Sequence, residues 1–129
     1  MNVKMLLAVA SVITVLYGIA FLLVPKAASA QFGITPDAAT ILADRFLAAA
    51  LLGLGLVIWF VRVTSDPTAL RGLLIGLSVG NAVGVVVAIW GNLRGITNAM
   101  GWSTVVIFGV LLAAYLYYLF TDSALAGRK

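Results

Sequence analysis

Cysteine, histidine and glutamate are all absent from this chain of 129 residues. Without cysteine there are no disulfide bonds, and without cysteine or histidine the usual zinc sites cannot form. Haem ligation by histidine and catalytic triads built on histidine or cysteine are excluded for the same reason. The acidic residues are aspartates alone: Asp37, Asp44, Asp66 and Asp122. We therefore expect no catalytic residue, no metal site and no cofactor, and the composition argues against an enzyme.

Charge of either sign is also scarce. Charged residues make up 9% of the chain, whereas soluble domains have about 25%. Hydrophobic residues make up 64%, whereas soluble domains have roughly 45–50%. A soluble fold or a disordered chain is excluded by these proportions. The net charge of +4 does not indicate nucleic-acid binding, because the basic residues stand singly at the ends of apolar stretches rather than in a cluster. The expected partner is the lipid bilayer.

Four apolar stretches are long enough to cross the hydrocarbon core, which takes about 20 helical residues. None of them alternates apolar with polar residues as a membrane β-strand does. The sequence predicts an all-α polytopic membrane protein, with residues 1–129 as a single domain. Short links favour an antiparallel up-down-up-down four-helix transmembrane bundle. The helices are expected at about residues 4–24, 36–63, 67–91 and 98–121.

Local signals indicate where these helices begin. Thr35 is expected to cap the second helix, with Pro36 in its first turn, and Asp66 to cap the third. Residues 25–35 form the longest connection, which we expect at the membrane interface. Residues 4–30 imitate a secretory signal that ends in small residues, but the apolar run exceeds the usual core of about 7–15 residues. We expect the first helix to be retained.

The distribution of basic residues indicates an orientation, because Lys and Arg accumulate on the cytoplasmic side. In the predicted topology five basic residues share the face that carries both termini, against three on the other face. Both termini are therefore predicted to be cytoplasmic, in the cell (inner) membrane. The first face carries Lys4, Arg62, Arg71, Arg128 and Lys129, and the second carries Lys26, Arg45 and Arg94.

A row of small residues is the most specific pattern in the third predicted helix. Glycine recurs every four residues, and alanine continues the series. Such a row lets another helix backbone approach closely in lipid, where packing rather than the hydrophobic effect drives helix association. It can serve packing within the bundle, which we expect, or a homo-oligomer or a larger membrane complex. The row is Gly72, Gly76, Gly80, Gly84 and Ala88, and the fourth predicted helix has Gly109 and Ala113 at the same spacing.

Polar residues suggest a second kind of site. Asn81 lies near the middle of the third predicted helix, with Ser78 one turn earlier. They either form hydrogen bonds between helices or line a path for a ligand or solute. Arg45 is either an interfacial anchor paired with an aspartate or an anion contact, with Asn92 and Asn98 expected near its level.

Scattered residues along most of the chain carry a family resemblance. They are Gly18 to Pro25, then Phe32-Gly33, Arg45 with Leu52-Gly53, and Asn98-Ala99. In this pattern the chain resembles small bacterial four-helix membrane proteins of unknown function and is broadly similar to DoxX-like proteins. The resemblance implies a bacterial inner-membrane bundle. It implies no activity and no site residues.

Two functions remain open from the sequence. The first is a structural or accessory subunit that packs through its glycine residues against itself or a larger membrane complex. The alternative is a small-solute carrier, channel or lipid-binding bundle that uses Asn81 and Arg45. The shortage of reactive groups favours the first.

Overall fold

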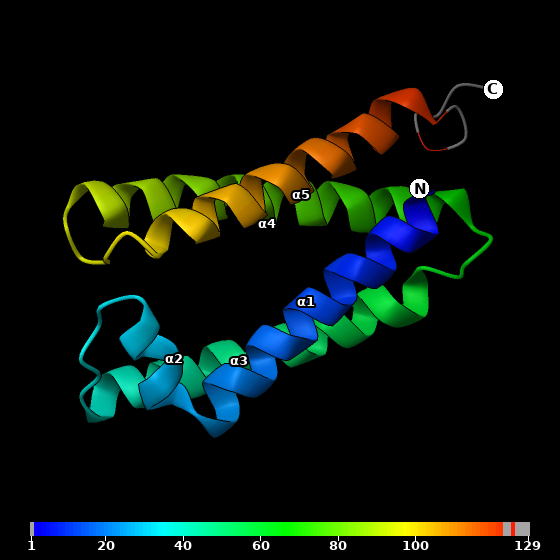
Figure 1. Ribbon diagram of the computed structural model, residues 1–129. Coiled ribbons are helices and arrows are strands. Elements are labelled where there is room, and N and C mark those ends of the chain that lie inside the picture. The colour runs from blue at the N-terminus through cyan, green and yellow to red at the C-terminus, as the bar shows by residue number, and fades with distance from the viewer. Residues whose placement is uncertain (1, 123–124, 126–129) are drawn as a thin grey trace.

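The computed structural model describes residues 2–122 and Leu125, and Figure 1 shows their arrangement. Four of the helices are long and apolar enough to cross a membrane, judged by length and composition. No strand occurs within residues 2–122. The prediction of a helical membrane protein with four long apolar helices is confirmed. The helices are α1 (Val3–Leu23), α2 (Pro25–Gln31), α3 (Ala38–Val61), α4 (Pro67–Leu93) and α5 (Gly101–Thr121).

The short helix α2 occupies part of the segment that was expected to be a connection. Pro25 is its first residue, where a missing backbone N–H and a fixed φ suit the start of a helix. Pro25, Ala28 and Ser29 are buried. The Ser29 hydroxyl donates a hydrogen bond of 2.6 Å to Asp44 Oδ2 on α3. This bond fixes α2 against the first half of α3.

The start of α3 corrects one expectation and the start of α4 confirms another. Asp37, rather than Thr35, caps α3, because its Oδ1 accepts both the backbone N–H and the hydroxyl of Thr40, each at 2.8 Å. These hydrogen bonds from Thr40 lower the pKa of the exposed Asp37 carboxyl. At α4, Asp66 Oδ1 accepts the Thr68 N–H at 2.9 Å, as predicted.

The long helices form two closely packed pairs, α1 with α3 and α4 with α5, and the members of each pair run in opposite directions (Figure 1). In the first pair, glycines let the backbones approach. Gly18 faces Leu52, and Gly55 faces Val15. The Ser11 hydroxyl also donates a hydrogen bond of 2.7 Å to the Gly55 carbonyl. In the second pair, Phe108 fills the space beside Gly84.

The two pairs share a hydrophobic core at one end of the molecule. It lies where α1 and α4 begin and where α3 and α5 end (Figure 1). Leucine side chains from α1 and α4 surround Tyr115 of α5, which is 1% exposed. The core consists of Leu6, Leu7, Ala10, Ile58, Leu70, Leu74, Leu77, Tyr115 and Leu125.

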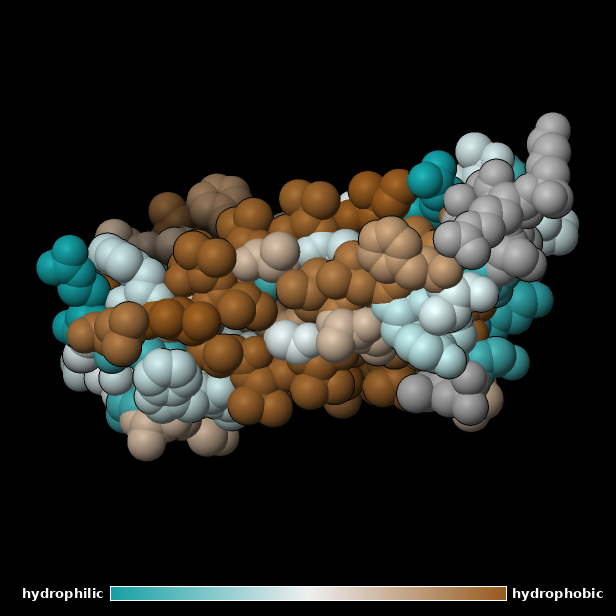
Figure 2. Space-filling model, turned by 90° about the horizontal axis from the view of Figure 1, so that it is seen from above, coloured by the Kyte–Doolittle hydropathy of each residue, from teal (hydrophilic) through white to brown (hydrophobic). Residues whose placement is uncertain are grey.

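The surface of the molecule is predominantly apolar. Figure 2 shows hydrophobic residues across the middle of one face and hydrophilic residues towards its two ends. The exposed fractions of the large apolar residues Phe46, Val86 and Phe120 are 69%, 67% and 72%. In water such a surface would be an aggregation hazard. Lipid chains are the environment that suits it.

We predict that Gly55→Leu weakens the α1–α3 pair. A Cβ on Gly55 would come within 2.5 Å of Val15 Cγ2 and 3.3 Å of the Val15 backbone nitrogen. Overpacking of this kind costs about 1–3 kcal/mol. The midpoint of thermal unfolding in mild detergent should fall. The matched control is Gly53→Leu, because a Cβ there meets nothing within 4 Å. Equal midpoints for the two variants would contradict this account of the pair.

Candidate functional site

The row of small residues on α4 is largely uncovered in the single chain. A Cβ added at Gly72, Gly76 or Gly80 would meet nothing within 4 Å, and all three positions are exposed. Only Gly84 meets a neighbouring helix, with the ring of Phe108 within 2.9 Å of an added Cβ. Packing within the bundle therefore accounts for one glycine of the row. The expectation that the whole row packs there is corrected, because the buried face of α4 carries Leu70, Leu74, Leu77, Ser78 and Asn81 instead.

The remaining small residues of the predicted set follow the same pattern. Ala88 is half-buried on α4. On α5, Gly109 has nothing within 4 Å of an added Cβ, and Ala113 is exposed. The spacing in the sequence showed that these small residues form rows along α4 and α5. It did not show whether each row faces a neighbouring helix or the outside of the molecule.

Asn81 and Ser78 lie inside, as their position in the apolar helix suggested. The Ser78 hydroxyl donates to the Leu74 carbonyl at 2.8 Å, and Asn81 Nδ2 donates to the Leu77 carbonyl at 2.8 Å. Both bonds stay within α4, so neither residue bonds to another helix through these donors. The other amide atom, Asn81 Oδ1, is buried and accepts no hydrogen bond. A buried carbonyl oxygen without a donor is unfavourable by about 1–3 kcal/mol.

The predicted polar path does not come together around Asn81. Asn92 is engaged near the end of α4, where its Nδ2 donates to the Ala88 carbonyl at 2.7 Å and its Oδ1 accepts the Thr97 hydroxyl at 2.8 Å. Arg45 is exposed on α3. The adjacent Asp44 accepts its hydrogen bond from Ser29. Asn92 therefore stabilises a turn, and Arg45 stays at the surface.

Asn98 joins the two helix pairs at the end opposite the hydrophobic core. Its backbone N–H donates to the Phe32 carbonyl at 2.9 Å, and its Nδ2 donates to the Gln31 carbonyl at 3.0 Å. Gly33 lies against the Asn98 side chain with φ +76°, a left-handed conformation that favours glycine. We call the contact of Gln31, Phe32 and Gly33 with Asn98 the Asn98 clasp.

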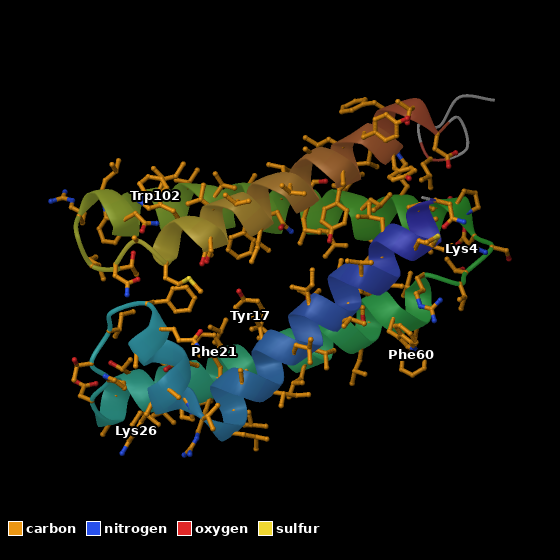
Figure 3. The ribbon with its side chains drawn as sticks, viewed as in Figure 1. Lys4, Tyr17, Phe21, Lys26, Phe60 and Trp102 are labelled. Atoms are coloured by element: carbon orange, nitrogen blue, oxygen red, sulfur yellow. The ribbon has the colours of Figure 1, made fainter. Side chains whose placement is uncertain are left out.

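A cleft that was not predicted from the sequence lies between the two pairs beside this clasp. Its volume is about 270 Å³. Tyr17 and Phe21 point from α1 into the space between the pairs (Figure 3), with their ring centroids 6.5 Å apart. The lining residues are Leu16, Tyr17, Ala20, Phe21, Val24, Ala27, Ala28, Gln31, Phe32 and Met100. Part of this lining follows a sequence pattern, because Tyr17, Ala20 and Phe21 recur at helical spacing on α1.

Two arginines stack on tryptophans at opposite ends of the molecule. The Arg62 guanidinium lies 3.8 Å from the Trp59 ring centroid at the end of α3, and the Arg94 guanidinium lies 6.0 Å from that of Trp90 after α4. Such contacts are attractive through the ring quadrupole. Paired cation and indole groups at helix ends suit the two interfaces of a membrane.

Comparisons of the chain with family models, with curated proteins and with solved structures find no match. The resemblance to DoxX-like proteins therefore stays a prediction. Among residues 2–122, no group of three or more histidine, cysteine, aspartate or glutamate side chains could hold a metal ion.

We predict that Asn98→Ala loosens the end of the molecule opposite the core. The substitution removes the bond to the Gln31 carbonyl and the bond of 3.0 Å that Asn98 Oδ1 accepts from the Met100 N–H. Amide hydrogen exchange at Met100 should speed up, while exchange in the middle of α1 stays unchanged. Asn2→Ala is the control, because the Asn2 side chain accepts the Met5 N–H at the start of α1, at the other end of the molecule. Unaltered exchange at Met100 would mean that the clasp does not hold this end.

Proposed function

We propose that this chain is a small structural or accessory subunit of the bacterial inner membrane, without catalytic activity. Its four long helices cross the bilayer in an up-down-up-down order. It assembles with a second copy or a larger membrane complex through the outer face of α4. That face is marked by Gly72, Gly76 and Gly80, which we call the open glycine face.

The contrast between covered and uncovered glycines carries this proposal. Within the chain, Gly18, Gly55 and Gly84 each allow a neighbouring side chain to come close. The open glycine face has no such neighbour, although each mid-helix glycine is less favourable than alanine by roughly 0.5–1 kcal/mol. These glycines lower the stability of α4, and no close contact within the chain compensates for that loss. Close packing against a helix from another chain would supply one, since small-residue rows serve helix association in lipid.

The charges support an orientation with both termini in the cytoplasm. Lys4 lies in the first turn of α1, Arg62 caps α3, and Arg71 lies near the start of α4. These helix ends lie on one side of the molecule (Figure 1). The positive-inside tendency assigns that side to the cytoplasm. Arg128 and Lys129, counted on the same side, lie outside the described residues.

The mass of the purified complex in mild detergent tests the proposal. Gly76→Leu and Gly80→Leu should shift the wild-type assembly to single chains, with dissociation increased about tenfold or more. Leucine forms helix better than glycine by about 0.8–1 kcal/mol, so unfolding of α4 would not explain the loss. Ala50→Leu enlarges an exposed residue on α3 and serves as the control. Wild-type protein that runs as a lone monomer, or variants with unchanged mass, would overturn the proposal.

One observation favours a second function, a carrier, channel or lipid-binding bundle that uses Asn81 and Arg45. Asn81 Oδ1 is buried without a donor, as expected of a group that meets a polar solute or ligand. If Asn81 serves transport, Asn81→Leu should abolish passage of K⁺, Cl⁻ or glycerol into protein-containing vesicles and leave the assembly mass unchanged. Ser78→Ala, which removes an internally bonded hydroxyl one turn away, is the control. Equal passage with wild-type, Asn81→Leu and empty vesicles would exclude this function for these solutes.

A further inference from the structure

We propose that the cleft beside the Asn98 clasp binds one acyl chain of a membrane phospholipid, and that it recognises the chain rather than the headgroup. The cleft lies between the second half of α1, the short helix α2 and the start of α5. The proposal does not depend on the open glycine face.

The walls of the cleft suit a hydrocarbon chain. Leu16 and Phe21 of α1 line the cleft together with Val24 just after that helix, and Phe32 and Met100 line it next to the clasp. Ala20, Ala27 and Ala28 keep the middle of the cleft open, because their side chains are small. The volume of about 270 Å³ lies just below the range of roughly 300–1,000 Å³ that holds drug-sized ligands. A single extended chain is narrower than such ligands.

The cleft is continuous with the surface that faces lipid. Leu16 and Val24 line it and are also 60% and 53% exposed, and Met100 is 49% exposed. Along α1 the lining runs from Leu16 to Phe21, a distance of about 7.5 Å at about 1.5 Å per residue, and it continues at Val24 beyond the helix end. A phospholipid chain that lies alongside α1 can therefore enter sideways from the bilayer without crossing a polar barrier.

Water is a poor occupant of this space. A stable internal water needs about 2–4 polar partners. Tyr17 and Gln31 are the lining residues with polar side chains, and no lining residue is charged. In a bilayer, hydrocarbon at the apolar mouth of the cleft would gain dispersion contacts with its walls.

The headgroup has no charged partner in the cleft. Lys26 lies on α2 next to the lining residue Ala27, but its side chain points away from the space between the helix pairs (Figure 3). An anionic and a zwitterionic phospholipid with the same chains should therefore bind equally well.

A bound acyl chain would also link the two helix pairs. The hydrophobic core joins them at one end and the Asn98 clasp at the other. Between these contacts, the cleft brings α1 and α2 opposite Met100 at the start of α5. A lipid chain there contacts both pairs and acts as part of the packing of the folded protein.

Native mass spectrometry of the detergent-purified full chain, titrated with phosphatidylcholine and phosphatidylglycerol of identical chains, tests the proposal. We expect one lipid to bind each protein molecule and to stay bound on dilution. The affinity should be equal for the two headgroups. Ala20→Phe fills the cleft from α1 and should lower this affinity about tenfold or more. Ala50→Phe adds the same ring on an exposed face of α3 and should bind lipid like the wild type.

A second variant covers the case in which Ala20→Phe fails to fold. Ala27→Leu narrows the cleft from an exposed position on α2 and should also reduce lipid retention. Equal retention by Ala27→Leu and wild type would overturn the proposal. So would lipid binding without a saturable single site, or a strong preference for phosphatidylglycerol, which would place recognition at a charged surface instead.

Discussion

Close approach of helix backbones at glycine is the interaction on which the rest of this structure depends. In lipid, two apolar helices gain little by leaving hydrocarbon for each other, so dispersion contacts and hydrogen bonds must hold them together. The α1–α3 pair obtains both at one place. Gly55 lets the backbones meet beside Val15, and the Ser11 hydroxyl donates a hydrogen bond to the Gly55 carbonyl. In the α4–α5 pair, Gly84 instead makes room for the ring of Phe108.

The two pairs are far less closely joined to each other than their members are. A leucine-rich core around Tyr115 connects them at one end. At the other end two hydrogen bonds from Asn98 reach the carbonyls of Gln31 and Phe32. The cleft lies beside this second contact, and the unsatisfied oxygen of Asn81 is buried on α4.

Much of the fold follows from the sequence, because long apolar runs and helix caps are local signals. The four long helices and the cap at Asp66 were predictable in this way. Thr35 was the expected cap of α3, but Asp37 caps it because Asp37 Oδ1 accepts two hydrogen bonds from Thr40. Helix α2 was missed because seven residues are too few for a clear apolar period.

The candidate site was harder to predict, because it depends on which helices become neighbours. Spacing alone identified the glycines of α4, but Gly84 is covered and Gly80 is open for reasons that lie in the position of α5. Asn98 was expected near a polar path, and its side chain bonds to Gln31 at the end of α2, 67 residues earlier in the chain. The cleft forms only when α1, α2 and Met100 are brought together.

The order of the helices along the chain has a consequence for biogenesis. The helices of each close pair follow one another in sequence, apart from the short α2, so α1 and α3 can complete their contacts before α4 and α5 have been synthesised. Asn98 lies just before α5, and its partners lie between α1 and α3. The Asn98 clasp can form once the loop before α5 has been synthesised, whereas the hydrophobic core also needs Tyr115 of α5. The order of synthesis therefore lets the α1–α3 pair pack first, and the shared core around Tyr115 can be completed only afterwards.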